Sequence, residues 1–147
     1  MIKTIISSEN VNELHPANQE IYNLAQSVYE QLGTGHTEFI YHRALEIELR
    51  NKNYTYETEK RVLISYTDGN GINYTLGEER IDIYLHQIPT IIELKAVVNQ
   101  PKENEIAQLF KYFREFKNTK FGVIINFPQC GTKAAKSTID FIEVLFN

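Results

Sequence analysis

The stretch RIDIYLHQIPTIIELK, residues 80–95, decides the fold. Its first half alternates strictly, which places Ile81, Ile83 and Leu85 on one face of a β-strand. After a turn, residues 90–98 are almost continuously apolar, as in a central strand that is buried on both faces of a sheet. The stretch therefore predicts an antiparallel hairpin whose second strand lies inside the sheet.

Three charged side chains interrupt this apolar hairpin. In a symmetric antiparallel pair around the turn, Asp82 lies opposite Glu93, and Lys95 follows on the same face. Two carboxylates at this spacing repel each other unless a cation lies between them, and hard oxygen ligands suit Mg²⁺ or Mn²⁺. The backbone carbonyl of Leu94 could add a ligand, and Lys95 could orient or deprotonate a water, or neutralise charge that develops on a phosphate. The pattern predicts a site for metal-assisted phosphodiester hydrolysis.

An alternative explanation of the same charges is a surface ion pair at a sheet edge, with Glu93 bound to Lys95 or Arg80. The neighbours of Glu93 argue for burial, because apolar side chains surround it in the sequence. A buried charge persists only when it is paired or bound to a metal. Burial therefore favours the metal site.

The rest of the chain supplies helices and further strands around this hairpin. Apolar residues at spacings of three and four predict helices over residues 16–32, 39–51 and 101–117. Strands are expected from residue 54 to a turn at 68–71, over 72–76 and 121–127, and as a closing element over 139–146, for which a helix is the alternative. Residues 129–137 are expected to form a polar loop or short helix. Together these elements predict an α/β domain, a mixed β-sheet flanked by helices, and the length of 147 residues fits a single domain over 1–147.

Composition and charge exclude several classes of protein. The net charge of −4 argues against a protein that coats nucleic acid non-specifically. Residues 1–100 hold 8 Lys/Arg and 14 Asp/Glu, whereas residues 101–137 hold 7 and 3, so a phosphate-facing surface should involve the second segment. Cys130 is the only cysteine, which excludes a disulfide framework and a cysteine-based zinc site. Without an apolar segment of membrane-spanning length, we expect a cytoplasmic, nucleoid-associated or virion-associated protein that is neither secreted nor bound to a membrane.

Two separately placed motifs resemble a known superfamily. Asp82, ten intervening residues and then Glu93-Leu94-Lys95 resemble the core motif of the PD-(D/E)XK nucleases, although Ile81 stands where the motif has proline. Downstream, Gln108 and Tyr112 resemble the Gln-x-x-x-Tyr pair of one branch of that superfamily, and helical spacing places both on one face.

A third motif resembles one family within the superfamily. Residues 35–41 read GHTEFIY and are followed by Ala44-Leu45, which is similar to the signature of the GxxExxY protein family. The three motifs span about residues 16–127 in the expected order. The resemblance implies a restriction-endonuclease-like fold.

The resemblance also implies a site and an activity. The side chains of the implied catalytic set are Glu38, Asp82, Glu93, Lys95, Gln108 and Tyr112. The implied metal ligands are Glu38, Asp82, Glu93 and the carbonyl of Leu94. The implied function is a Mg²⁺- or Mn²⁺-dependent nuclease that hydrolyses DNA, with RNA as an alternative substrate and a homodimer as a possible assembly. The competing hypothesis is a catalytically idle nuclease-like module that serves nucleic-acid binding or protein assembly, because the chain is acidic and small.

Plainer explanations remain for several of these residues. Glu38 is also suited to complement the dipole of a helix N-terminus, and Tyr41 and Tyr112 are suited to core packing with a hydroxyl partner. His36 and His42 lie near Glu38, but a His-x-Glu pattern more often marks a helix start than a zinc site. We therefore do not include either histidine in the predicted site.

Overall fold

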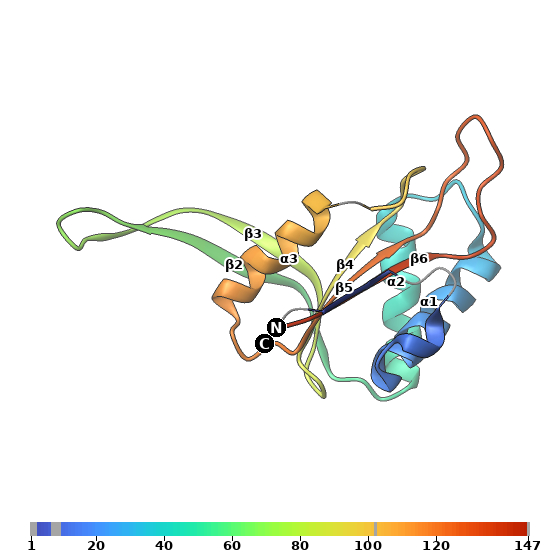
Figure 1. Ribbon diagram of the computed structural model, residues 1–147, viewed down its shortest axis with the longest axis horizontal. Coiled ribbons are helices and arrows are strands. Elements are labelled where there is room, and N and C mark those ends of the chain that lie inside the picture. The colour runs from blue at the N-terminus through green and yellow to red at the C-terminus, as the bar shows by residue number, and fades with distance from the viewer. Residues whose placement is uncertain (1–2, 7–9, 102, 147) are drawn as a thin grey trace.

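The computed structural model describes residues 3–6, 10–101 and 103–146, and shows helices on both sides of one sheet (Figure 1). The helices are α1 (Pro16–Leu32), α2 (Glu38–Asn51) and α3 (Glu103–Glu115), with a short 3-10 helix η1 (Val11–Glu13). The strands are β1 (Lys3–Ile6), β2 (Tyr56–Thr67), β3 (Asn73–Leu85), β4 (Thr90–Lys95), β5 (Phe121–Asn126) and β6 (Asp140–Leu145). The predicted helix over 101–117 is found as α3, and Lys102 lies outside the described residues.

The six strands form one mixed sheet in the order β1-β6-β5-β4-β3-β2. Strands β4 and β5 are parallel and the other neighbouring pairs are antiparallel. The predicted α/β architecture, a mixed sheet flanked by helices, is therefore confirmed. Strand β1, which pairs with β6, was not predicted, and the expectation of a single domain over 1–147 stays a prediction.

Each face of the sheet has its own apolar core. Helices α1 and α2 cover one face, with Ile83 and Leu94 of the sheet beneath them, and α3 covers the other face, over Ile91 and Ile124 (Figure 1). Strands β4 and β5 are buried on both faces, as the continuous apolar runs predicted. None of the helices in the described part of the chain is long and apolar enough to cross a bilayer.

Strands β3 and β4 diverge partway along their length. Their pairing joins Leu85 to Thr90 and ends at Ile83 opposite Ile92, in the predicted register. Beyond that point β3 stays paired with β2, and the two strands project from the body as a twisted ribbon (Figure 1). We call the point of divergence the fork. Asp82 and Glu93 stand just beyond the last pair, so the fork positions the candidate site.

The strict alternation predicted for β3 is wrong at one residue. Ile83 and Leu85 pack under α1 and α2, but Ile81 packs in the core beneath α3. In the neighbouring strand β2 the register is the same at Thr58 opposite Ile83 and at Lys60 opposite Ile81, but Glu59 between them adopts a left-handed backbone with φ of 53°. Next to this irregular residue, the side chains of Ile83 and Ile81 lie on opposite faces of the sheet.

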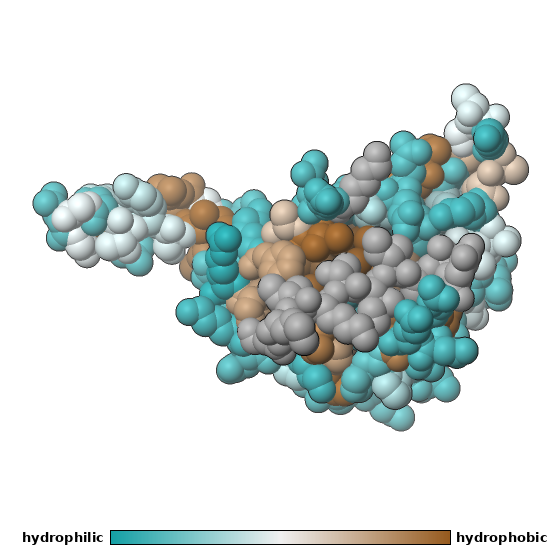
Figure 2. Space-filling model, in the orientation of Figure 1, coloured by the Kyte–Doolittle hydropathy of each residue, from teal (hydrophilic) through white to brown (hydrophobic). Residues whose placement is uncertain are grey.

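The ribbon beyond the fork is exposed and partly apolar. The sequence predicted a strand that ends at residue 76, but β3 continues through Gly77. The register shift between Ile64 and Ser65 leaves Leu76 as the extra residue of a bulge. The turn predicted at residues 68–71 closes the ribbon, with Gly71 at a φ of 81°. Figure 2 shows hydrophobic atoms on the ribbon surface. The exposed apolar side chains of this region are Leu63, Tyr66, Ile72, Tyr74 and Leu76.

A buried amide fixes the end of β4 next to the fork. The side chain of Asn126 on β5 accepts a hydrogen bond from the Val97 amide at 2.9 Å and donates to the Val97 carbonyl at 3.2 Å. Its amide nitrogen also donates to the buried carboxylate of Asp140 at 3.0 Å. The chain that leaves β4 after Lys95 is thereby held to the sheet.

We expect Asn126→Ala to lower the free energy of unfolding by about 2–4 kcal/mol, because the buried Val97 amide and Asp140 Oδ2 lose their hydrogen-bond partner, while Asp140 Oδ1 keeps its ion pair with Lys136. Urea denaturation monitored by circular dichroism measures this loss. Asn118→Ala, at an exposed turn position, is the matched control and should change stability by less than about 0.5 kcal/mol. Equal losses in the two variants would contradict the role of Asn126.

Candidate active site

Two carboxylates stabilise the backbone at the fork. The Leu94 amide donates to Asp82 Oδ2 at 2.8 Å, and the Asp82 amide donates to Glu93 Oε1 at 3.4 Å. These amides no longer face a strand partner because β3 and β4 have separated, and a buried amide without an acceptor is costly. The fork therefore draws both carboxylates into the gap between the strands and places them side by side.

Burial and repulsion keep one of these carboxylates neutral. Glu93 is buried, and burial first and the neighbouring Asp82 second raise its pKa to about 9. At neutral pH the pair thus holds one proton when no cation is bound. The two groups offer hard oxygen atoms in a buried, negatively charged position, and this donor set fits a divalent cation such as Mg²⁺ or Mn²⁺.

The N-terminus of α2 brings a further carboxylate toward the fork. Glu38 is the first residue of α2, after the N-cap Thr37. Burial raises the pKa of Glu38, the charge of Asp82 raises it further, and the charge of Lys95 lowers it. These influences put Glu38 within electrostatic reach of Asp82 and Lys95. As the first residue of α2 it also complements the helix dipole, and its role as a metal ligand stays a prediction.

Lys95 is the last residue of β4 and is partly buried. Its positive charge lowers the pKa of both Glu93 and Glu38, which places it within electrostatic reach of the two carboxyl groups. The structure thus gathers four of the predicted residues, Glu38, Asp82, Glu93 and Lys95, around the fork.

The two predicted residues of α3 approach from the other face of the sheet. Gln108 Nε2 donates to the Tyr112 hydroxyl at 2.8 Å, and this hydroxyl donates to the Arg80 carbonyl at 3.4 Å. Burial first and the charge of Glu93 second raise the pKa of Tyr112 to about 12, so its hydroxyl stays protonated. These hydrogen bonds of Gln108 and Tyr112 hold β3 in place beside the fork, and the role of both residues in chemistry stays a prediction.

Tyr41 of the motif at residues 35–41 has a structural role. Its side chain is fully buried, and its ring stacks on Phe127 with 4.5 Å between the ring centroids. Its hydroxyl donates to the Gly33 carbonyl at 2.6 Å and accepts from Gln129 Nε2 at 3.0 Å. Core packing with hydroxyl partners, the plainer of the two explanations, is confirmed for this residue. These contacts anchor the turn that carries Glu38.

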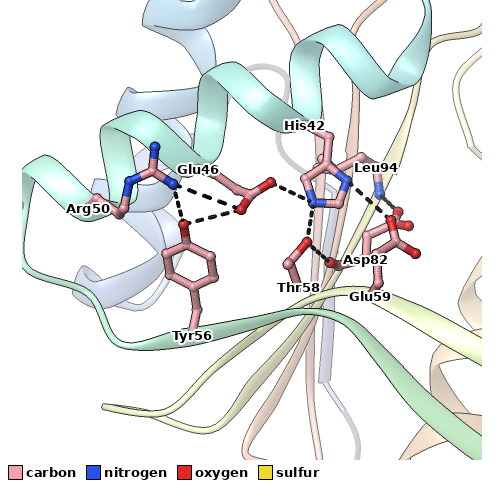
Figure 3. A network of polar contacts seen from close by, with 8 residues as sticks. All are labelled: His42, Glu46, Arg50, Tyr56, Thr58, Glu59, Asp82 and Leu94. Carbon is pink, nitrogen blue, oxygen red and sulfur yellow. Dashed lines mark hydrogen bonds and ion pairs between the residues drawn. The ribbon is translucent and has the colours of Figure 1, made fainter.

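Two residues outside the predicted set also lie at the site. Ligand atoms of His42, Glu59 and Asp82 all lie within 4.8 Å of one another, and we call these three residues the histidine cluster (Figure 3). His42 lies one turn after Glu38 on α2, so helical spacing was a signal that could have identified it. No sequence pattern pointed to Glu59, because the placement of its side chain at the site depends on its left-handed backbone.

The strain at Glu59 is measurable as a difference between two variants. We expect Glu59→Gly to be more stable than Glu59→Ala by about 1 kcal/mol, since only alanine keeps the Cβ atom that opposes a left-handed conformation. Chemical denaturation of both variants without metal gives the comparison. The same pair of substitutions at Glu57, an ordinary position of β2, should favour alanine. A less stable glycine variant at position 59 would contradict the strained backbone.

The raised pKa of Glu93 predicts that cation binding depends on pH. Because cation-free protein holds a proton that the bound state must release, the Mn²⁺ affinity should rise up to about tenfold per pH unit from about pH 6 to pH 9 and then level off. Calorimetric titration in buffers of different ionisation enthalpy measures the released proton. The stability of the cation-free protein should fall over the same range, since unfolded Glu93 gives up this proton near pH 4.5. Affinity that is constant across this range would contradict the assignment.

One comparison with known proteins identifies the family of the chain. Residues 15–138 match the family model described as the PD-(D/E)XK nuclease superfamily. The solved structure of SSO0001 is 24% identical to the chain with a TM-score of 0.46, over 60% of this chain and 44% of that one, so the match spans less than half of SSO0001. No curated protein matches the chain. With most of its length matched by the family model and a mixed sheet between helices, the chain belongs to the PD-(D/E)XK nuclease superfamily and has its restriction-endonuclease-like α/β fold.

Proposed function

We propose that the protein is a Mg²⁺- or Mn²⁺-dependent deoxyribonuclease that hydrolyses phosphodiester bonds, and that it belongs to the GxxExxY family within the superfamily. One observation carries the proposal: two adjacent carboxylates meet at the fork, and one of them, Glu93, is buried and has a raised pKa although the charge of Lys95 acts on it. Such an arrangement destabilises the ion-free state and favours a divalent cation. A surface ion pair would not need Glu93 to be buried, so its burial favours the metal site over that explanation.

In the proposed reaction, the residues that would hold the cation are Asp82, Glu93, Leu94 through its carbonyl, and Glu38. A bound divalent cation would polarise the phosphate and lower the pKa of an attacking water. Lys95 follows Leu94 on the same strand and can orient or deprotonate that water, or balance negative charge that develops on the phosphate. Gln108 and Tyr112 keep β3 in place and thereby position Asp82.

The proposed substrate is DNA, with RNA as the alternative. The excess of lysine and arginine in residues 101–137 supports a phosphate-facing surface, because exposed cations such as Lys117, Lys120 and Lys133 lie in this segment. A homodimer would pool two such surfaces and offset the acidic remainder of the chain. The composition suits action in the cytoplasm, or together with a nucleoid or virion.

The second candidate function is a module that binds nucleic acid or assembles with protein but does not cleave. The observation that favours it is the acidic charge of residues 1–100, which a DNA duplex would meet outside the basic segment. Cleavage separates the two functions, since only the nuclease hydrolyses nucleic acid when a cation is bound at the fork.

We expect Mn²⁺ at about one hundred times its dissociation constant to raise the melting temperature of the wild type by about 5–10 °C, and Asp82→Asn to abolish this rise. With linear and circular DNA as substrates, Lys95→Ala should lower the cleavage rate at least about 100-fold while the metal-dependent rise in melting temperature remains. Lys52→Ala, at an exposed position after α2, is the matched control and should cleave at the wild-type rate.

Each pattern of results selects one function. Stabilisation by Mn²⁺ with no cleavage of DNA or RNA would support the non-cleaving module. No response to any divalent cation, with wild-type behaviour in Asp82→Asn and Lys95→Ala, would show that the carboxylates at the fork are structural.

A further inference from the structure

Gln129, which has no part in the proposed reaction so far, joins the turn before α2 to the sheet. Its Oε1 accepts a hydrogen bond from the Gly35 amide at 2.8 Å, and its Nε2 donates to the Tyr41 hydroxyl at 3.0 Å. The same Nε2 donates to the carbonyl of Phe127, directly after β5, at 2.9 Å. One half-buried side chain therefore ties both ends of the segment 35–41 to the sheet.

Glu38 lies at the centre of this segment, three residues after Gly35 and three before Tyr41. The hydrogen bonds of Gln129 thus hold the chain on both sides of Glu38. Gly35 has a φ of 95°, a conformation that would strain a residue with a Cβ atom, and in this bend its amide meets Gln129. Both the glycine and the tyrosine of the motif therefore contact one side chain, and the glutamate lies between these two contacts.

The start of α2 needs such an anchor for two reasons. The N-cap residue Thr37 makes no capping hydrogen bond with its side chain, so the usual anchor of a helix N-terminus is missing. The charge of Asp82 also raises the pKa of Glu38, because the two carboxylates repel each other. This repulsion favours a movement of Glu38 away from the fork, and the hydrogen bonds of Gln129 oppose that movement.

The backbone of Gln129 contacts the other side of the candidate site. Its amide donates to the Val97 carbonyl at 3.1 Å, two residues after Lys95. Val97 is also held by the side chain of Asn126 on β5. Gln129 is thus hydrogen-bonded both to the chain that leaves β4 and to the turn that precedes α2, so it links the positions of Lys95 and Glu38.

We infer that Gln129 is a positioning residue that holds Glu38 beside the fork, where Glu38 serves as a ligand of the cation. The inference rests on the proposed function, because it concerns the cation of the same site. An amide suits this task, since it offers one acceptor and two donors without a charge. A carboxylate at position 129 would repel Glu38, and an ammonium group would pair with Glu38 and compete with the cation.

Calorimetric titration of the full chain with Mn²⁺ tests the inference without any measurement of cleavage. Gln129→Met keeps the length of the side chain but none of its hydrogen bonds, and it should weaken Mn²⁺ binding about tenfold, because residues that orient a metal ligand typically contribute about 10–100-fold. Glu38→Gln should weaken Mn²⁺ binding at least as much. The double variant should bind Mn²⁺ as Glu38→Gln does, since Gln129 acts through Glu38.

Gln87→Met is the matched control. Gln87 also accepts from an amide, that of Thr55 at 3.0 Å, and donates to a carbonyl, that of Asn53 at 3.0 Å, but it lies in the turn between β3 and β4. Both methionine variants should unfold at a lower urea concentration than the wild type, whereas only Gln129→Met should lose Mn²⁺ affinity. In DNA cleavage, Gln129→Met should lower kcat about tenfold and leave KM for DNA unchanged, because Glu38 acts on the cation and not on the DNA.

The outcomes separate this inference from the proposed nuclease. Wild-type Mn²⁺ affinity in Gln129→Met, or a double variant that binds Mn²⁺ more weakly than Glu38→Gln, would overturn the positioning role, and cleavage by the wild type would then leave the nuclease proposal intact. The expected pattern of Mn²⁺ affinities in a protein that cleaves no nucleic acid would support the role of Gln129 and refute the nuclease. A wild type that binds no divalent cation would overturn both.

Discussion

The separation of β3 from β4 is the constraint on which the rest of the structure depends. Pairing stops at Ile83 and Ile92, in the interior of the protein, and leaves backbone amides that need acceptors. Asp82 and Glu93 supply those acceptors, so the same contacts that stabilise the divergence concentrate negative charge at one point. The divergence also frees β2 and β3 to continue as a ribbon. The candidate metal site and the projecting ribbon therefore have one structural origin.

The charge gathered at the fork explains why this region is suited to bind a cation. Lys95 is one positive charge among Glu38, Asp82, Glu93 and Glu59, and the cation-free protein reduces the repulsion by keeping a proton on Glu93. A proton and a divalent cation are thus alternative ways of neutralising the same group. The cation is the stronger of the two above neutral pH, where the proton becomes scarce.

The sequence predicts the features that follow from local periodicity. The apolar alternation determined the register that places Ile83 opposite Ile92, because a shift by one residue would turn the buried side chains to the wrong face. It did not predict the reversal at Ile81, which lies next to the left-handed backbone of Glu59 in the neighbouring strand. Strand β1 was missed because four residues of apolar and polar character gain their structure from pairing with β6. Helical spacing indicates that His42 lies near Glu38, but it does not predict the partners of His42, which come from β2 and β3.

Helix α2 connects the two parts of the site, because it carries Glu38 at its N-terminus and His42 one turn later. The network of Glu46, Arg50 and Tyr56 joins α2 to β2, yet a buried carboxylate is a costly way to hold two elements together when apolar packing would serve. The same carboxylate lies 3.4 Å from His42 Nε2, so it also fixes the orientation of the His42 ring. The proposed cation ligands thus come from both layers, with Asp82 and Glu93 on the sheet and Glu38 on the helix. The angle at which α2 packs on the sheet therefore determines how far Glu38 lies from the two carboxylates of the fork.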